Sequence, residues 1–187
     1  EKSQPGSKLN ISESFEKIKN SLNDSPETSY IPLSVSIEEP EISSDDPSKY
    51  QIKELIGIGK SDFTGSSSTR IHNIKTAAKR FNGLVLKPEE EFSFTTILGE
   101  VDENTGYKEE LVIKKNQTVP EYGGGICQVS TTMFRAALNS GTKITERHNH
   151  SYSVNYYDPP GTDATVYVPQ PDLKFKNNTN SYLNFFH

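Results

Sequence analysis

The chain has 187 residues, a formal net charge of −5, and 32% hydrophobic and 10% aromatic residues. This composition suffices for the core of one medium-sized domain with a fragment of another. No apolar run is long enough to span a bilayer, and an acidic chain without a basic stripe argues against nucleic acid as the main partner. The single cysteine excludes an internal disulfide, and it fits either a reducing compartment or an exported protein.

The N-terminal part of the chain contains one predicted helix and one predicted strand. Apolar residues share one helical face over 12–22, and apolar and polar residues alternate over 31–37. One helix and one strand cannot bury a core alone. We therefore expect residues 1–46 to be the C-terminal part of a larger module, or a piece that packs on the rest of the chain.

A polar, turn-rich stretch at Ser43–Ser48 predicts a domain boundary, with a second domain over 47–187. Helical spacing of apolar residues predicts two main helices, over 70–81 and from 126 to a stop at 139–141. Alternating or continuous apolar residues predict strands at 52–58, 92–94, 111–113, 143–157, 162–168 and 173–175. This order lacks a repeating βαβ rhythm, so it predicts an α+β fold with a mostly antiparallel sheet.

The only cysteine lies where a glycine run, Gly123-Gly124-Gly125, meets the second predicted helix. Three consecutive glycines indicate backbone that approaches a partner closely or adopts positive φ, as in a ligand-binding loop. Cys127 falls in the first helical turn, where unpaired N–H groups and the helix dipole stabilise a thiolate and lower its pKa. The pattern fits a nucleophile, and it fits equally the competing interpretation of a small, buried, apolar side chain.

Partners for a thiol nucleophile lie later in the chain. His148 and His150 are two residues apart and share one face of the strand predicted over 143–157. Either can act as the base or imidazolium partner, and Asp163 on the next predicted strand can orient the ring. Gln128 and the N–H groups of the glycine run are candidate oxyanion donors.

Other interpretations of these residues stay open. Cys127 with both histidines could form a metal site with an open position, although a bare His-x-His without ordinary zinc spacing disfavours it, and we predict no metal and no cofactor. The histidines can also be hydrogen-bonded strand residues without a catalytic role. Glu146 or Glu91 could protonate a glycosidic oxygen, although a surface glutamate is more often solvated or paired with an arginine.

Several distinctive blocks of residues lie between about residue 60 and the end of the chain. They are Ser66–Ile74, Ala77-Ala78, Asn82-Gly83, Phe92-Ser93-Phe94, Gly106-Tyr107, Gly123–Thr132, Glu146–Tyr152 and Gly161–Val166. Together they closely resemble the VanW-domain family, and the glycine–cysteine block is long and specific. Two residues depart from the family pattern: Glu89 stands at the glycine of Pro-Gly-Glu, and Thr95 stands at an asparagine.

The resemblance implies an exported bacterial envelope protein, anchored in the membrane through a segment outside this sequence, with peptidoglycan as partner. It also implies that residues 1–46 are the tail of a peptidoglycan-binding-like module. The family takes its name from an association with vancomycin resistance. Within the histidine block the resemblance favours His150 over His148 as the thiol partner, because Ser151 and Tyr152 continue the block beyond His150.

Three functions are compatible with this sequence. The first is a thiol-dependent peptidase or transpeptidase that forms an acyl-enzyme on Cys127 with a peptidoglycan peptide. The second is a glycan-cleaving enzyme, such as a lytic transglycosylase with a glutamic acid, and the third is a non-catalytic wall-binding module. Candidate substrate-binding residues are Tyr122, Gly123, Gly124, Gly125, Gln128, Arg70, Asn73, Glu91 and Tyr152.

Overall fold

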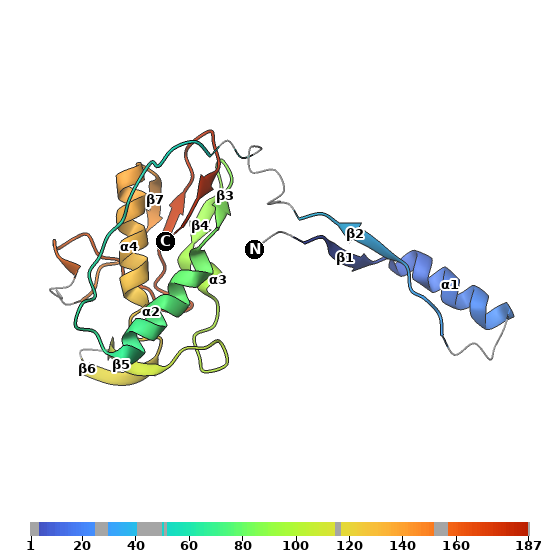
Figure 1. The fold of residues 1–187 in the computed structure, drawn as a ribbon, viewed down its shortest axis with the longest axis horizontal. Coiled ribbons are helices and arrows are strands. Elements are labelled where there is room, and N and C mark those ends of the chain that lie inside the picture. Colours follow the sequence, from blue (N-terminus) through green and yellow to red (C-terminus); the bar gives the residue numbers. More distant parts are fainter. Residues whose placement is uncertain are drawn as a thin grey trace. The chain divides into compact units, whose positions relative to one another are not determined.

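The computed structural model describes residues 4–24, 30–40, 50, 52–114, 117–151 and 157–186. The chain divides into two compact units, residues 1–49 and 50–187 (Figure 1). In the described part of the chain, no helix combines the length and the apolar character that crossing a membrane requires. The assignment of the first unit to a peptidoglycan-binding-like module stays a prediction.

The first unit contains one helix and a two-stranded antiparallel sheet. Strand β1 (Gly6–Leu9) pairs with β2 (Val35–Glu38), and helix α1 (Ile11–Asp24) begins directly after β1. Asn10 starts the helix: its Oδ1 accepts a hydrogen bond from the Glu13 N–H at 3.1 Å, and its Nδ2 donates one to the Glu13 carboxylate at 3.1 Å. Such a reciprocal cap satisfies polar groups that the first helical turn leaves unpaired.

Most large apolar side chains described in this first unit lie on its surface. The buried residues there are Ser14 and Ser34, and the Ser34 N–H donates to the Ser14 hydroxyl at 3.0 Å. The predicted helix is present, while the strand predicted over 31–37 is confined to β2. The exposed apolar residues are Leu9, Ile11, Phe15, Leu22, Tyr30, Leu33, Val35 and Ile37. These elements therefore bury no apolar core within the unit.

The two main helices predicted for the second unit are confirmed. Helix α2 (Ser68–Phe81) begins after Ser67, whose hydroxyl accepts a hydrogen bond from the Arg70 N–H at 3.0 Å. Helix α4 (Ile126–Ser140) ends at Gly141, which has a left-handed φ of 71°. Its N–H bonds the last carbonyls of the helix, as expected for a C-terminal glycine.

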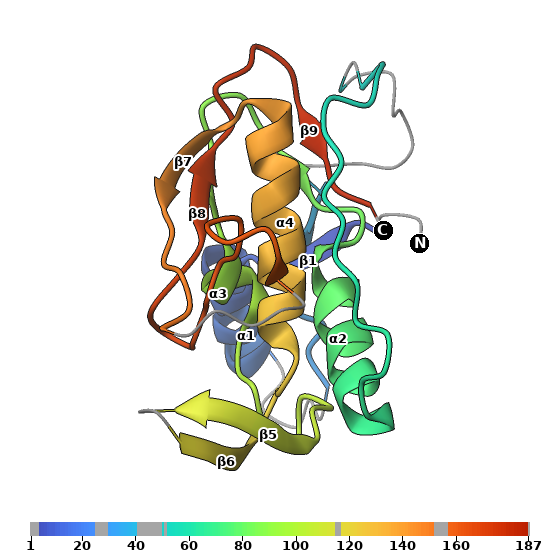
Figure 2. The same ribbon diagram turned by 90° about the vertical axis from the view of Figure 1, so that its left-hand side faces the viewer.

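Short antiparallel strands and one short helix complete the second unit, which confirms the α+β class. Figure 2 shows α4 between the β7–β8 strands and α2, with the β5–β6 hairpin beyond the N-terminal end of α4. The elements are β3 (Val85–Leu86) paired with β9 (Leu183–Asn184), the sheet β4 (Glu91–Ser93), β8 (Lys174–Lys176) and β7 (Lys143–Glu146), the hairpin β5 (Glu109–Lys114) and β6 (Gln117–Tyr122), and helix α3 (Phe94–Leu98).

Several predicted strands are shorter than expected or absent. Residues 52–58 and 162–168 form no strand, and the strand predicted over 143–157 ends at Glu146. Residues 152–156 lie outside the described part. Pro159, Pro160, Pro169 and Pro171 flank residues 162–168, and a proline cannot donate to a strand ladder, so a strand could not extend beyond this stretch on either side.

Phenylalanine rings fill the centre of the second unit. Phe92 on β4 is paired with Phe175 on β8, and the two rings stack with their centroids 4.4 Å apart. Phe81 of α2 stacks on Phe94 of α3, also at 4.4 Å. All four side chains are at most 3% exposed. Because these rings come from a sheet and two helices, their packing joins the layers of the unit.

An extended strap, residues 57–62, lies against α4. Its carbonyl groups accept hydrogen bonds from three side chains spaced along the helix. Gly59 permits this close approach, since a Cβ at that position would lie 1.8 Å from the Thr132 carbonyl oxygen. The bonds run from Asn139 Nδ2 to Ile58 O (2.7 Å), from Arg135 Nη1 to Lys60 O (2.8 Å) and from Gln128 Nε2 to Asp62 O (3.2 Å).

Glu89 has a left-handed backbone, with φ at 66° in the turn between β3 and β4. It is the one non-glycine residue with positive φ among those described. A left-handed conformation costs a residue with a Cβ about 1–2 kcal/mol. The carboxylate of Glu89 lies 2.6 Å from Lys176 Nζ, but an exposed ion pair contributes little to stability.

We expect Glu89→Gly to stabilise the chain by up to about 1 kcal/mol. The relief of backbone strain exceeds the extra entropy that glycine gives the unfolded chain, about 0.4–1 kcal/mol. Glu90→Gly provides a contrast at a residue with ordinary φ, and it should lower stability, because it also removes the carboxylate that accepts a hydrogen bond from the Lys87 N–H at 2.8 Å. Urea unfolding measures both free energies. A lower stability for Glu89→Gly would contradict the strain argument.

Removal of residues 1–46 should leave the second unit folded. Its core and the strap lie entirely within 50–187, and Tyr50 packs edge-on against Tyr182 at 5.1 Å between centroids. Thermal unfolding should therefore stay cooperative. A deletion of residues 1–63 is the matched control: it also removes the strap and should lower the midpoint. Loss of cooperative unfolding on the shorter deletion would show that the first unit completes the core.

Candidate functional site

Helix α4 places Cys127 at its second residue, in the first turn as predicted. The helix begins after Gly125, whose φ of 113° lies in the region that side chains with a Cβ rarely adopt. A Cβ on Gly125 would also lie only 3.0 Å from side-chain atoms of Arg70 and Ile74 on α2. The close approach of α2 and the positive φ explain why glycine precedes this helix. The thiol of Cys127 is free and partly buried.

His150 and Asp163 lie beside the thiol. The Nδ1 atom of His150 is 2.6 Å from Asp163 Oδ2, and the same oxygen accepts a hydrogen bond from the His150 N–H at 2.7 Å. The His150 ring also interacts with the Cys127 thiol through a hydrogen bond and through charge. Because Nδ1 faces the carboxylate, Nε2 is the nitrogen left for the thiol. The structure thus brings together three of the residues proposed from the sequence.

The three groups shift one another's pKa values toward the charged forms. Burial raises the pKa of the Cys127 thiol, but the hydrogen bond and charge of His150, together with smaller contributions from Val166 and Thr165, hold that pKa below its ordinary value. Burial likewise opposes protonation of His150, while Cys127 and Asp163 raise its pKa above the ordinary value. Burial opposes ionisation of Asp163 too, and its bonds with His150 lower its pKa. The geometry therefore favours a thiolate–imidazolium pair beside an ionised carboxylate.

Buried hydroxyl groups on α4 fix the segment that carries Asp163. Ser130 Oγ donates to the Ala164 carbonyl at 2.6 Å, and the Ala164 N–H donates to Thr131 Oγ1 at 3.1 Å. The next residues then meet the thiol: Cys127 Sγ lies 3.8 Å from Thr165 Oγ1 and 3.6 Å from the Val166 carbonyl oxygen. Asp163 is therefore positioned by side-chain hydrogen bonds to a helix, and the strand predicted for it does not exist.

His148 and Glu146 lie apart from the thiol arrangement. β7 ends at Glu146, so the two histidines do not share a strand face as expected. His148 is exposed, with Nε2 3.4 Å from the Glu146 carboxylate. Lys174 Nζ lies 2.9 Å from the same carboxylate, and this hydrogen bond is the largest cause that lowers the pKa of Glu146. An ionised glutamate is poorly suited to protonate a leaving group.

The polar residues predicted to bind substrate on α2 and α4 are used inside the protein. Gln128 is 1% exposed; its Oε1 accepts from Arg70 Nη2 at 2.9 Å and its Nε2 bonds the strap. Asn73 is fully buried and donates to the carbonyl groups of Lys108 and Gly124 at 2.9 and 3.1 Å. These contacts hold the glycine run against α2. They leave the side chain of Gln128 unable to serve as an oxyanion donor in this arrangement.

The remaining predicted binding residues differ in exposure. Tyr122, at the end of β6, is 37% exposed, whereas Gly123 and Gly124 are buried. Glu91 is exposed on β4. Tyr152 lies outside the described residues. In the described ranges, no three His, Cys, Asp or Glu side chains are arranged to hold a metal ion.

Two residues at the site were not assigned from the sequence. Arg147 bonds Asp163, and the ring of Tyr157 stacks on the His150 ring with centroids 4.7 Å apart and planes at 24°. Arg135 on α4 donates to the Tyr157 carbonyl at 2.7 Å and so fixes that residue. Arg147 is adjacent to His148 in the sequence block, but residue spacing alone does not identify its partner.

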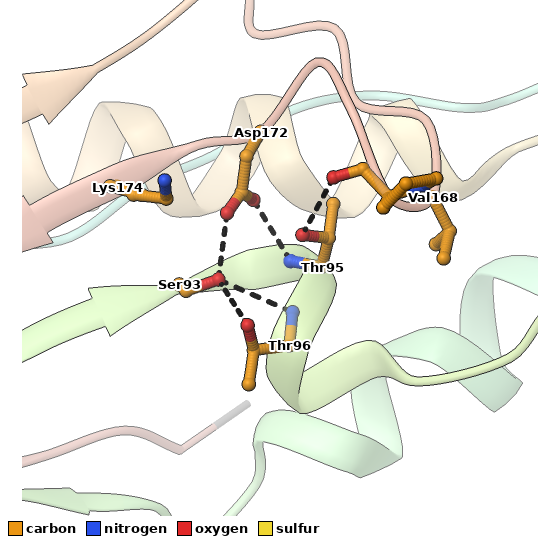
Figure 3. Close-up of a pocket in the computed structure, with 7 residues that line it drawn as sticks. Ser93, Thr95, Thr96, Val168, Asp172 and Lys174 are labelled. Carbon is orange, nitrogen blue, oxygen red and sulfur yellow. Dashed lines mark hydrogen bonds between the residues drawn. The ribbon is translucent and has the colours of Figure 1, made fainter.

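A separate hollow of about 220 Å³ lies beside α3 (Figure 3). The Asp172 carboxylate accepts hydrogen bonds there from Ser93 Oγ at 2.7 Å and from the Thr95 N–H at 2.9 Å. These groups satisfy one another, and none of the three residues of the thiol arrangement lines the hollow. The lining residues are Ser93, Thr95, Thr96, Val168, Pro169, Asp172 and Lys174. We therefore assign no function to it.

Iodoacetamide should label Cys127 in the folded protein with a midpoint pH below the roughly 8.5 of a free thiol. A lowered pKa leaves more thiolate at neutral pH, and the thiolate is the reactive form. His150→Ala should raise the midpoint, because His150 provides the bond and the charge that counteract burial. His148→Ala is the matched control and should leave it unchanged. Labelling that requires denaturation would instead identify a buried structural thiol.

Comparison with known proteins gives the relationship of the chain. The sequence model of the family described as VanW like protein matches residues 69–185. The chain is 43% identical over 118 residues to the Bacillus subtilis (strain 168) protein named Uncharacterized protein YoaR, covering 63% of this chain and 39% of that relative. It is 35% identical over 114 residues to Vancomycin B-type resistance protein VanW of Enterococcus faecalis (strain ATCC 700802 / V583), covering 59% of this chain and 42% of that relative.

The chain thus spans about two fifths of the length of these curated relatives. No solved structure matches it. The family match includes the glycine run, Cys127, His150 and Asp163, and it covers more than half of the chain. The chain belongs to the VanW-like family.

Proposed function

We propose that this chain is a thiol-dependent acyl-transfer enzyme that acts on the peptide part of peptidoglycan. The observation that carries the proposal is the contact of His150 with both Cys127 and Asp163. Nucleophile, imidazole and orienting carboxylate are the parts that a covalent thiol mechanism requires. A relative named for vancomycin resistance supports a role in the cell envelope, and we infer that the protein is exported.

The proposed reaction has two steps. The Cys127 thiolate attacks the carbonyl carbon of a peptide bond, and the imidazolium of His150 gives its proton to the departing amine. This forms a thioester and leaves His150 neutral. Water or a second amine then attacks the thioester while His150 accepts its proton, and the C–S bond breaks to restore the thiolate. Water gives hydrolysis, and an amine gives a new peptide bond.

Asp163 and the start of α4 have supporting parts in this reaction. The Asp163 carboxylate holds the Nδ1 side of His150 and stabilises the imidazolium. The neighbouring N–H groups of Ile126 and Gln128 already donate to the Gly123 and Gly125 carbonyls, at 3.0 and 2.9 Å, whereas the backbone N–H of Cys127 lies between them in the first helical turn. That N–H is our candidate donor to the negative oxygen that develops when sulfur attacks.

Cleavage of glycan strands has weaker support. A glutamic acid that protonates a glycosidic oxygen needs a raised pKa, whereas the bond from Lys174 and the contact with His148 lower the pKa of Glu146. A non-catalytic role in wall binding does not explain why three titratable groups shift one another toward a thiolate–imidazolium pair. Peptide chemistry is therefore the function that the geometry supports best.

Purified peptidoglycan incubated with the chain should release new amino groups. Cys127→Ala should lower this rate by at least about three orders of magnitude, since removal of a covalent nucleophile leaves only binding and oxyanion stabilisation. Glu146→Gln should retain most of the activity. Hydroxylamine, as a competing nucleophile, should trap the acyl group as a hydroxamate. New reducing or anhydro sugar ends in place of amines, lost in Glu146→Gln, would replace this proposal with glycan cleavage.

A further inference from the structure

Arg147 comes directly after β7, and both of its side-chain hydrogen bonds go to Asp163. Its Nε donates to the Asp163 carbonyl oxygen at 2.7 Å, and its Nη2 donates to Asp163 Oδ1 at 3.0 Å. The guanidinium carbon lies 5.1 Å from the ring centroid of Phe134, a buried residue of α4. The Arg147 side chain is 23% exposed, so the ion pair is partly shielded from water. Arg147 is therefore anchored between a helix and the segment that carries Asp163.

The two carboxylate oxygens of Asp163 have different partners. Oδ2 accepts both bonds from His150, and Oδ1 accepts the bond from Arg147. Rotation of the carboxylate about its χ2 angle would break contacts on both sides at once. Because the same guanidinium also bonds the backbone of Asp163, it fixes the side chain relative to the main chain. The orientation of the His150 ring depends on that carboxylate.

We propose that Arg147 is a positioning residue for the thiol site, which acts through Asp163 to hold the imidazolium of His150 against Cys127. The inference rests on the proposed function, because it requires Cys127 to react as a thiolate. A lysine at this position would supply a charge but no planar fork, so it could not hold the carbonyl and the carboxylate of Asp163 in one geometry. The other charged groups on this stretch pair among themselves, as Glu146 bonds Lys174 and His148.

The test measures the pH midpoint of iodoacetamide labelling of Cys127 in the 187-residue chain. Arg147→Met should raise the midpoint by about one pH unit, because a loosely held carboxylate stabilises the imidazolium less. Labelling near neutral pH then falls about tenfold, as one pKa unit changes the thiolate fraction by that factor. Arg147→Lys should also raise the midpoint, since it keeps the charge and loses the fork. Arg80→Met, an exposed arginine in the last turn of α2, should leave it unchanged.

A double-mutant cycle identifies the route of the effect. If Arg147 acts through Asp163, then adding Arg147→Met to Asp163→Asn produces no further shift of the midpoint. A shift that adds in full to that of Asp163→Asn would overturn the proposal. A wild-type midpoint in Arg147→Lys would also overturn it, because charge alone would then suffice. Where circular dichroism shows that Arg147→Met does not fold, Arg147→Lys and its cycle with Asp163→Asn decide.

The same data separate this inference from the proposed function. Labelling of Cys127 needs no peptidoglycan, so a shifted midpoint in the Arg147 variants supports the positioning role even if the chain cleaves no peptide bond. An unchanged midpoint together with Cys127-dependent release of amines would retain the enzyme and reject the role of Arg147. Labelling of the wild-type chain only after denaturation would reject both.

Discussion

The site depends on two buried hydroxyl groups that replace a strand pairing. Ser130 and Thr131 are fully buried on α4, and the hydroxyl groups of both form hydrogen bonds with the backbone of Ala164. This satisfies backbone polar groups that would otherwise be buried without partners. The bonds to Ala164 also fix which residues of the segment face the site. Asp163 comes directly before Ala164, and Thr165 comes directly after it, beside the thiol. The nucleophile and its orienting carboxylate are thus positioned from adjacent turns of one helix.

Local sequence predicted the parts of the fold that are determined locally. Both main helices can be predicted from apolar spacing, and the place of Cys127 in the first turn from the glycine run. Strand pairing joins distant residues, so the strands at 52–58 and 162–168 were predicted wrongly from alternation alone. For the site, the sequence supplied Cys127, His150 and Asp163 as candidates. It could not supply the contact of Arg147 with Asp163, because that contact depends on where β7 ends.

A polar residue in a distinctive block can bind substrate or can form hydrogen bonds inside the protein. Here several of these residues do the second. Gln128, Arg70 and Asn73 were predicted to meet substrate, but they form hydrogen bonds that connect α2, the glycine run and α4. A buried amide side chain must have hydrogen-bond partners, just as a side chain that binds substrate must be correctly placed. Tyr122, by contrast, stays partly exposed at the entrance to the glycine run. Sequence alone does not distinguish internal hydrogen bonding from substrate binding, since both require the same polar residue types at these positions.

Through the strap, Gly59 affects the surroundings of the Cys127 thiol although the two residues are far apart in the sequence. At Gly59 the backbone of the strap meets the backbone of α4 with no room for a side chain. An alanine there would displace the Asp62 carbonyl from Gln128, and Gln128 would then be free to turn away from Arg70. Arg70 also forms part of the wall against which Gly125 packs. A single methyl group placed outside the matched residues 69–185 would thereby loosen the turn that introduces the nucleophile.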